Sequence, residues 1–193
     1  MIIRMLKEEE LIPAAGLSRY VFDACLRNRM EFTQSIPFIE NYISETNIRS
    51  MSNENKLVVW GVFEEEQLVA VGGMQTDGMI TLLYVLPQYF GRGCGMNLLQ
   101  VMRGYANDVL HLPRVLVNAT PAWTSVYFKK QGFEPIHTAS AVGVPFVSMQ
   151  AMTEKVKVQK KERISGLTIL LAILACVGFA TIASVIFMLS YLM

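Results

Sequence analysis

Hydrophobic and polar positions alternate with two different periods along the first 152 residues. Strand-like runs, rich in β-branched and aliphatic residues, occur at residues 2–6, 56–63, 67–75, 79–86, 114–118, 133–136 and 144–152. Helical spacing of apolar positions occurs at residues 11–28, 35–44, 96–109 and 121–131. The resulting order β-α-α-β-β-β-α-β-α-β-β predicts an α/β fold of the α+β kind, with one mixed sheet, in a single domain over residues 1–152.

A second pattern begins after this domain. From Ile164 to Met193 there are 30 consecutive residues with no Asp, Glu, Lys, Arg or His. A helix rises about 1.5 Å per residue, so roughly 20 apolar residues cross the hydrocarbon core of a bilayer. The pattern therefore predicts one C-terminal transmembrane helix over residues 167–192.

A basic segment separates the domain from the predicted span. Residues 154–163 hold five basic and two acidic side chains, a balance of 5 − 2 = +3, whereas residues 1–153 carry 12 − 14 = −2. The basic residues are Lys155, Lys157, Lys160, Lys161 and Arg163. Positive residues stay on the cytoplasmic side and attract anionic lipids. We therefore expect a basic juxtamembrane linker at 153–166, lipid contacts through 155–192, and a single-pass protein of the cell membrane whose N-terminal domain is cytoplasmic.

Composition narrows the function classes. Hydrophobic residues make up 52% of the chain and charged residues only 17%, which excludes a disordered chain or a basic nucleic-acid binder. Cys25, Cys94 and Cys176 are widely spaced and form no CxxC pair, which is typical of reduced thiols. With only two histidines and no clustered thiols, the sequence predicts no metal site.

The stretch with the clearest chemistry is a glycine loop. Gly91, Gly93 and Gly95 alternate between a predicted strand and a predicted helix. Backbone N–H groups in such a turn can point together at an anion, and the helix N-terminus adds its partial positive charge, which suits a pyrophosphate. The dinucleotide fingerprint GxGxxG fails because position 96 is Met, and no Gly-Lys-Ser/Thr of a P-loop follows. Three glycines in an ordinary turn are the alternative.

The loop and its neighbours resemble the GNAT (Gcn5-related) N-acetyltransferases. The run Phe90-Gly-Arg-Gly-Cys-Gly95 is similar to the family's pyrophosphate loop, Gln/Arg-x-x-Gly-x-Gly/Ala, with Phe90 in place of Gln or Arg. Leu83-Tyr-Val-Leu-Pro87 resembles the strand that receives pantetheine. Asn118-Ala-Thr-Pro-Ala and Tyr127-Phe-Lys-Lys-Gln-Gly-Phe133 resemble the second cofactor motif. The resemblance covers residues 1 to about 152.

The resemblance implies an N-acetyltransferase that moves acetyl directly from acetyl-CoA to a primary amine. Together with the predicted span and basic segment, we expect a membrane-anchored enzyme that acts on the cytoplasmic side. The cofactor-binding residues it implies are Leu83, Tyr84, Val85, Gly91, Arg92, Gly93, Cys94, Gly95, Met96 and Asn118. Acetyl-CoA would be a co-substrate, with no metal. The alternative is a catalytically weak acetyl-CoA-binding sensor or adaptor at the membrane. Neither the amine nor the oligomeric state follows from the sequence.

Proton-transfer groups depart from the family pattern. The usual general acid, a Tyr, corresponds to Phe128, and the hydroxyl lies one residue earlier at Tyr127. One residue turns a helical side chain by about 100°, so Tyr127 is either the catalytic acid or a packing residue. The family's strand-borne Glu base corresponds to Met79. Possible substitutes are Asp77, Glu31 and Tyr84, and the two histidines are His111 and His137.

Overall fold

The computed structural model describes residues 1–30, 33–141 and 144–153, all within one compact unit, Met1–Lys155. The predicted transmembrane helix at 167–192 and the linker beyond Thr153 lie outside the described residues. Within the described ranges, no helix is long and apolar enough to cross a membrane.

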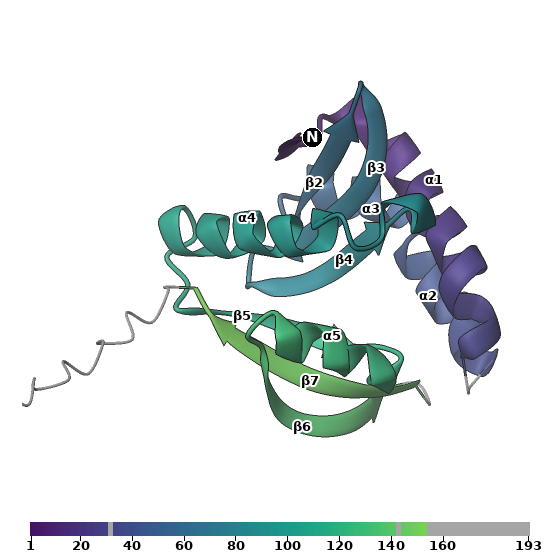
Figure 1. Cartoon of the computed structure of the whole chain (residues 1–193), viewed down its shortest axis with the longest axis vertical. Helices are drawn as coiled ribbons and strands as arrows, with labels where there is room; N and C mark the ends of the chain where they lie inside the picture. Colours follow the sequence, from purple (N-terminus) through teal and green to yellow (C-terminus); the bar gives the residue numbers. More distant parts are fainter. Residues whose placement is uncertain (31–32, 142–143, 154–193) are drawn as a thin grey trace, which may run out of the picture. The chain divides into compact units, whose positions relative to one another are not determined.

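A seven-stranded mixed sheet forms the centre of the domain, in the order β1-β2-β3-β4-β5-β7-β6 (Figure 1). The strands are β1 (Ile2–Met5), β2 (Leu57–Glu64), β3 (Gln67–Gln75), β4 (Met79–Val85), β5 (Arg114–Ala119), β6 (Glu134–Ala141) and β7 (Val144–Met152). All neighbouring strands are antiparallel except β4 and β5, which are parallel. This arrangement confirms the mixed sheet expected from the hydrophobic pattern.

Two tight turns connect β2, β3 and β4. Glu65 and Glu66 both have positive φ (48° and 67°) in the turn between β2 and β3. In the next turn Gly78 has φ 91°, and the Asp77 carboxylate accepts a hydrogen bond from the backbone N–H of Met79 (3.0 Å). Glycine has no Cβ to clash in this left-handed conformation, which is why the Asp-Gly pair marks the turn in the sequence.

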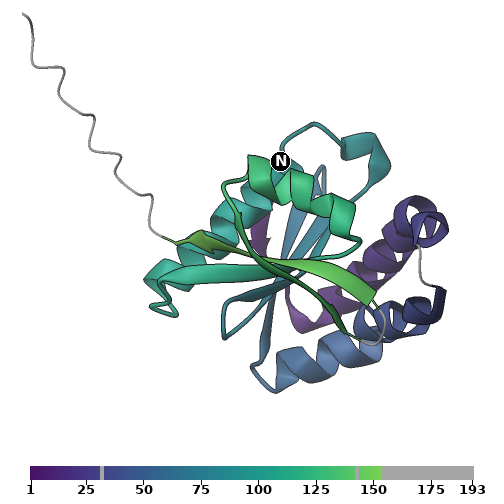
Figure 2. The ribbon, with the colours of Figure 1, turned by 90° about the horizontal axis from the view of Figure 1, so that it is seen from below.

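The parallel contact between β4 and β5 is short. Only Met79 and Ile80 pair with β5, opposite Leu116 and Val117, after which the two strands separate (Figures 1 and 2). On its other edge β4 stays paired with β3, where a bulge places Thr81 between the pairs Gly73↔Leu82 and Met74↔Ile80. Beyond Ile80, the edge of β4 on the β5 side therefore pairs with no strand, and a gap opens in the sheet.

Helices cover both faces of the sheet. On one face α1 (Leu11–Val21), α2 (Ile36–Tyr42) and α3 (Glu45–Asn53) pack on strand residues such as Val59, Val71 and Leu82. On the other face α4 (Cys94–Asp108) and α5 (Ser125–Lys130) pack on residues such as Val69, Val115 and Met149. Figure 2 shows α5 and the N-terminal helices on opposite sides of the strands. Both apolar faces of the strands are thereby buried, as a mixed sheet between helices requires.

Some elements differ from the expectation. The helix expected over 11–28 ends as α1 at Val21 and continues as a π-helical turn, Phe22–Leu26, and a 3₁₀ turn, Arg27–Arg29. The segment expected as one helix over 35–44 is α2, and α3 follows directly. The Ser44 hydroxyl caps α3 by accepting a hydrogen bond from the Asn47 N–H (3.2 Å). Helix α3 is mostly polar, and Ile48 is its only fully buried residue, with Met51 one turn later packed against the same core.

Candidate functional site

A cavity of about 940 Å³ opens where β4 and β5 separate. Its lining comes from β4, β5, the glycine loop, the start of α4 and α5. Of the residues that the sequence assigned to cofactor binding, those that line the cavity are Leu83, Tyr84, Val85, Gly91, Gly93, Cys94, Gly95, Met96 and Asn118. The cavity thus brings together residues that are more than 30 positions apart in the chain, such as Leu83 and Asn118.

The unpaired edge of β4 forms one wall of this cavity. Backbone groups on an unpaired strand edge can bond to an extended ligand as a further strand would. The side chains of Leu83 and Val85 pack toward the α4 face, whereas Tyr84 packs toward the α1 face. The strand thus offers backbone groups to an extended amide-bearing chain.

The glycine loop joins this strand edge to α4. Gly91 and Gly93 have φ of 75° and 83°, and Gly93 is the N-cap of the 15-residue helix α4. A Cβ on Gly91 would meet open space, and one on Gly93 would meet no atom closer than 3.7 Å. The glycines are therefore required by backbone conformation rather than by packing. The loop presents the free N–H groups of the first turn of α4 and the positive end of its dipole to an anion.

Arg92 is the one assigned cofactor residue that does not line the cavity. Its guanidinium lies 3.7 Å from the Glu64 carboxylate and 4.9 Å from the centre of the Tyr89 ring. A hydrogen bond to Glu64 raises the pKa of Tyr89. Arg92 thus connects the loop to the end of β2.

Tyr127 and Phe128 both line the cavity, and Phe128 also belongs to the core. The Tyr127 hydroxyl oxygen lies 2.6 Å from the position a Cβ on Gly95 would occupy, so it rests directly on the first turn of α4. Phe128 is only 7% exposed and packs edge-to-face on Phe133, with ring centres 5.5 Å apart. Burial raises the pKa of Tyr127, which keeps the phenol protonated at neutral pH. The one-residue shift therefore leaves the Tyr127 hydroxyl at the cavity, against the first turn of α4.

The Cys94 thiol is buried at the same helix start. It is 1% exposed, and burial raises its pKa. A thiol with a raised pKa is a poor nucleophile at neutral pH, because the thiolate is the reactive form. Cys94 therefore contributes packing and its backbone to the loop.

A second cavity, of about 360 Å³, lies on the α1 face of the same gap. It shares Leu26, Ile80, Thr81, Tyr84, Asn118 and Thr120 with the first cavity. Its other walls come from the π-helical turn, α2, β3 and the β6–β7 hairpin, through residues such as Phe22, Phe38, Tyr42, Gln75 and Phe146. The two cavities thus meet at the bulge of β4.

The expected substitutes for a catalytic base are scattered. Met79, at the family's base position, lines the second cavity. Asp77 is exposed in its turn, where it bonds to the Met79 N–H, and His111 and His137 are exposed and line neither cavity. Burial strongly raises the pKa of Tyr84, so this phenol stays neutral. Glu31 lies outside the described residues.

Thr81 holds an unsatisfied hydroxyl between the two cavities. Its Oγ1 is buried and has no hydrogen-bond partner among the described residues. Leaving a buried polar group unpaired costs about 1–3 kcal/mol, so most buried hydroxyls in proteins are bonded. The bulge at Thr81 therefore carries a buried hydroxyl that no described residue satisfies.

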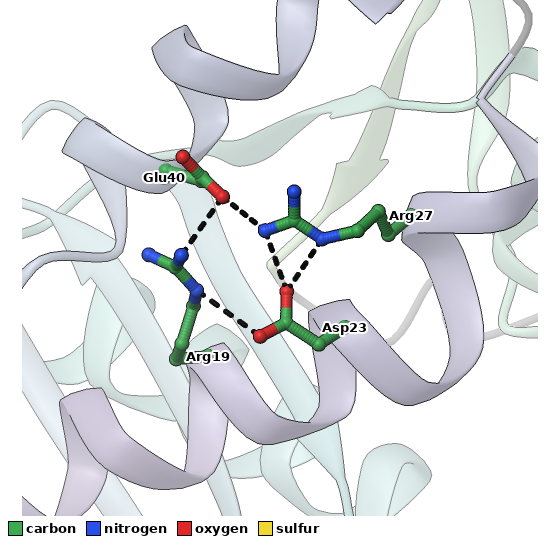
Figure 3. A network of polar contacts seen from close by, with 4 residues as sticks. All are labelled: Arg19, Asp23, Arg27 and Glu40. Atoms are coloured by element: carbon green, nitrogen blue, oxygen red, sulfur yellow. Dashed lines mark hydrogen bonds and ion pairs between the residues drawn. The ribbon is translucent and has the colours of Figure 1, made fainter.

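Two arginines and two carboxylates tie the π-helical turn to α2 (Figure 3). Asp23 pairs with Arg19 (3.2 Å) and Arg27 (2.8 Å). Glu40 of α2 pairs with Arg19 (2.8 Å) and, at short range, with Arg27. A hydrogen bond from Arg27 is the main reason that the pKa of Asp23 is lowered. This network fixes two walls of the second cavity and was not expected from the sequence.

Neither cavity contains a recognisable metal centre. No group of three or more His, Cys, Asp or Glu side chains is arranged to hold a metal ion in residues 1–30, 33–141 and 144–153.

A family model and solved structures both relate the chain to acetyltransferases. A family model for the acetyltransferase (GNAT) domain matches residues 26–153. A GCN5-related N-acetyltransferase from Rhodopseudomonas palustris has a TM-score of 0.64 at 16% identity, covering 78% of this chain and 94% of that one. A search of curated protein sequences found no significant match.

Two further solved structures have the same fold. The PaiA N-acetyltransferase from Thermoplasma acidophilum in complex with coenzyme A has a TM-score of 0.56 at 16% identity, over 79% of this chain and 99% of that one. A mutant spermidine N-acetyltransferase from Vibrio cholerae has a TM-score of 0.54 at 16% identity, over 79% and 95%.

Proposed function

The chain belongs to the GNAT acetyltransferase family and is an acetyl-CoA-dependent acyltransferase, and we propose that it acetylates a primary amine at the cytoplasmic face of a membrane. One observation carries the site assignment: the cavity between β4 and β5 runs along an unpaired strand edge and ends at the glycine loop. An extended pantetheine arm suits the edge, and a pyrophosphate suits the N–H groups and dipole of α4.

The proposed chemistry is direct transfer. The lone pair of a neutral amine attacks the thioester carbonyl carbon, the C–N bond forms, and the C–S bond breaks. The departing thiolate takes a proton from the Tyr127 hydroxyl, which is protonated at neutral pH and lies at the start of α4. The proton lost by the amine goes to water, and water reprotonates Tyr127.

The second candidate is an acetyl-CoA-binding sensor or adaptor. The placement of Met79 favours it, because the family's base position lines the second cavity with an apolar side chain. We favour the enzyme over the sensor. The reaction needs a base only to deprotonate the amine, and water can accept that proton.

Product analysis separates the two candidates. The full chain, purified in mild detergent, is incubated with acetyl-CoA and a panel of primary amines, and N-acetylated product and free coenzyme A are quantified by mass spectrometry. If the protein is an enzyme, amide and free coenzyme A should form in equal amounts. Tight binding of acetyl-CoA with no amide from any amine contradicts the enzyme and supports the sensor.

We further propose that residues 167–192 anchor the protein with residues 1–152 inside the cell. The support is the absence of charge from Ile164 to Met193 and the net charge of +3 at 154–163. Protease added to intact cells should leave residues 1–152 uncut, whereas lysed cells should lose them. Cleavage in intact cells contradicts this topology.

A further inference from the structure

A carboxylate lies beside the glycine loop that is assigned to the pyrophosphate. Glu64 is the last residue of β2, and its carboxylate lies 3.7 Å from the Arg92 guanidinium. It also accepts a hydrogen bond from the Tyr89 hydroxyl, which raises the pKa of that phenol. Tyr89 lines the first cavity, whereas Glu64 and Arg92 line neither cavity. A negative charge therefore lies close to the place where a second negative group is expected to bind.

The charges of Glu64 and Arg92 both act on the start of α4. Cys94 is the first residue of this helix, and burial is the main reason that the pKa of its thiol is raised. The charge of Glu64 raises that pKa further, and the charges of Arg92 and of the N-terminal ammonium lower it. Glu64 thus weakens the positive potential that attracts an anion to this helix end, and Arg92 offsets its effect.

The loop does not need this ion pair to keep its shape. Its backbone is held by hydrogen bonds from the N–H of Tyr89 to the Leu86 oxygen (2.8 Å) and from the N–H of Arg92 to the Tyr89 oxygen (3.3 Å). The side chains of Arg92 and Glu64 are 55% and 34% exposed, and an exposed ion pair contributes little to stability. The pair therefore acts on the charge of the site rather than on its fold.

We infer that Arg92 assists cofactor binding by neutralising Glu64 beside the pyrophosphate site, and not by donating hydrogen bonds to the pyrophosphate itself. Arg92 keeps its contacts with Glu64 and with the Tyr89 ring when the cofactor binds. Glu64 in turn lowers the affinity for acetyl-CoA and for the product coenzyme A, because both carry the same phosphates. The inference rests on the proposed function, which assigns the glycine loop to the pyrophosphate.

Coenzyme A binding in charge variants tests the inference. Coenzyme A is titrated by calorimetry into the full chain in detergent, at about 50 mM and about 500 mM NaCl. At the lower salt concentration Arg92→Gln should weaken binding about threefold to tenfold, and Glu64→Gln should tighten it by a similar factor. The double variant should bind within about twofold of the wild type, because both charges are removed together. At the higher salt concentration all four proteins should agree within about twofold, because salt screens charges near the surface.

A conservative variant separates charge from hydrogen bonding. Arg92→Lys keeps the positive charge but loses the planar fork that recognises phosphate through two hydrogen bonds. It should therefore bind coenzyme A within about twofold of the wild type. Binding as weak as that of Arg92→Gln would mean that the guanidinium contacts the pyrophosphate, which would overturn the inference.

Glu66→Gln is the matched control for Glu64→Gln. Glu66 is exposed in the turn between β2 and β3, and among the described residues Arg92 forms its ion pair with Glu64 and not with Glu66. Removal of the Glu66 charge should change coenzyme A affinity by less than about twofold. A gain as large as that of Glu64→Gln would assign the effect to the net charge of the turn and overturn the specific role of Glu64.

The outcomes separate the inference from the proposed function. If the wild type does not bind coenzyme A, the proposed function fails and the inference fails with it. If the wild type binds coenzyme A, only the inference is at stake. It is then overturned by an unchanged affinity in Glu64→Gln, by a double variant that stays as weak as Arg92→Gln, or by differences that persist at the higher salt concentration.

Discussion

The contact between Tyr127 and Gly95 can be tested by a double-mutant cycle. A Cβ on Gly95 would lie 2.6 Å from the Tyr127 hydroxyl oxygen, 3.5 Å from its ring carbon Cζ and 3.8 Å from Val85 Cγ2. Ordinary contacts begin at 3.4 Å, so Gly95→Ala requires a shift of 3.4 − 2.6 = 0.8 Å. Tyr127→Phe removes the oxygen and leaves only ordinary contacts for the new methyl group.

The expected magnitude follows from two opposing effects. Overpacking of this kind costs about 1–3 kcal/mol. Alanine is favoured over glycine in a helix by up to about 1 kcal/mol, and Gly95 lies in the first turn of α4. Gly95→Ala should therefore destabilise the wild-type protein by roughly 0–2 kcal/mol and stabilise the Tyr127→Phe protein by up to about 1 kcal/mol. The coupling between the two sites should be about 1–3 kcal/mol.

Thermal unfolding followed by circular dichroism measures this coupling. The four full-length proteins are compared in the same detergent, where about 1 kcal/mol corresponds to a Tm change of roughly 2–4 °C. Additive effects, within about 0.5 kcal/mol, would refute the placement of the Tyr127 hydroxyl at the start of α4.

Two further predictions concern single side chains. Tyr127→Phe should lower kcat by about 10²-fold or more with unchanged acetyl-CoA affinity, because the proton for the thiolate is lost; turnover within twofold of wild type would exclude Tyr127 as the acid. Glu10 accepts hydrogen bonds from Arg4 (2.6 and 2.7 Å) and from the backbone N–H of Lys7 (2.9 Å), which lower its pKa from 4.5 to about 2. Its folded-state pKa is depressed, so the ionised carboxylate stabilises the fold above pH 4.5 and this contribution is lost as the pH falls toward 2. In a pH series of thermal unfolding, Glu10→Gln should cost about 0.5–1 kcal/mol at neutral pH, discounted for solvent screening, and progressively less as the pH falls from 4.5 through 2; a constant difference would contradict the pairing.

The strands and the position of the glycine loop could be predicted from the sequence because their signals are local. The apolar runs at 67–75 and 144–152 coincide with β3 and β7, because turn residues mark the limits of each run. The glycine loop was recognisable because Gly91 and Gly93 adopt a left-handed backbone that other residues rarely take. Helix α3 was missed because it is short and mostly polar, with Ile48 as its one fully buried residue.

The orientation of side chains in the site could not be predicted. A 3₁₀ turn, Ala122–Thr124, precedes α5, so the rotation of Tyr127 and Phe128 about the helix depends on where the α-helical turns begin. The second cavity is built from elements that are distant in the chain, and the Arg27–Glu40 ion pair joins residues 13 positions apart. Its unpaired Thr81 hydroxyl arises from the bulge opposite Gly73 and Met74, which depends on pairing with β3.

Acetyl-CoA affinity of the glycine-loop variants tests the central claim most directly. Gly93 has φ 83° at the N-cap of α4, so Gly93→Val strains the loop backbone and places a branched side chain beside the N–H groups assigned to the pyrophosphate. Gly104→Val is the matched control, because a Cβ at Gly104 meets no atom within 4 Å and Gly104 lines neither cavity. Calorimetry on the full chain should show acetyl-CoA affinity reduced at least tenfold in Gly93→Val and unchanged in Gly104→Val. Wild-type affinity in a folded Gly93→Val protein would contradict the assignment of this loop to the cofactor.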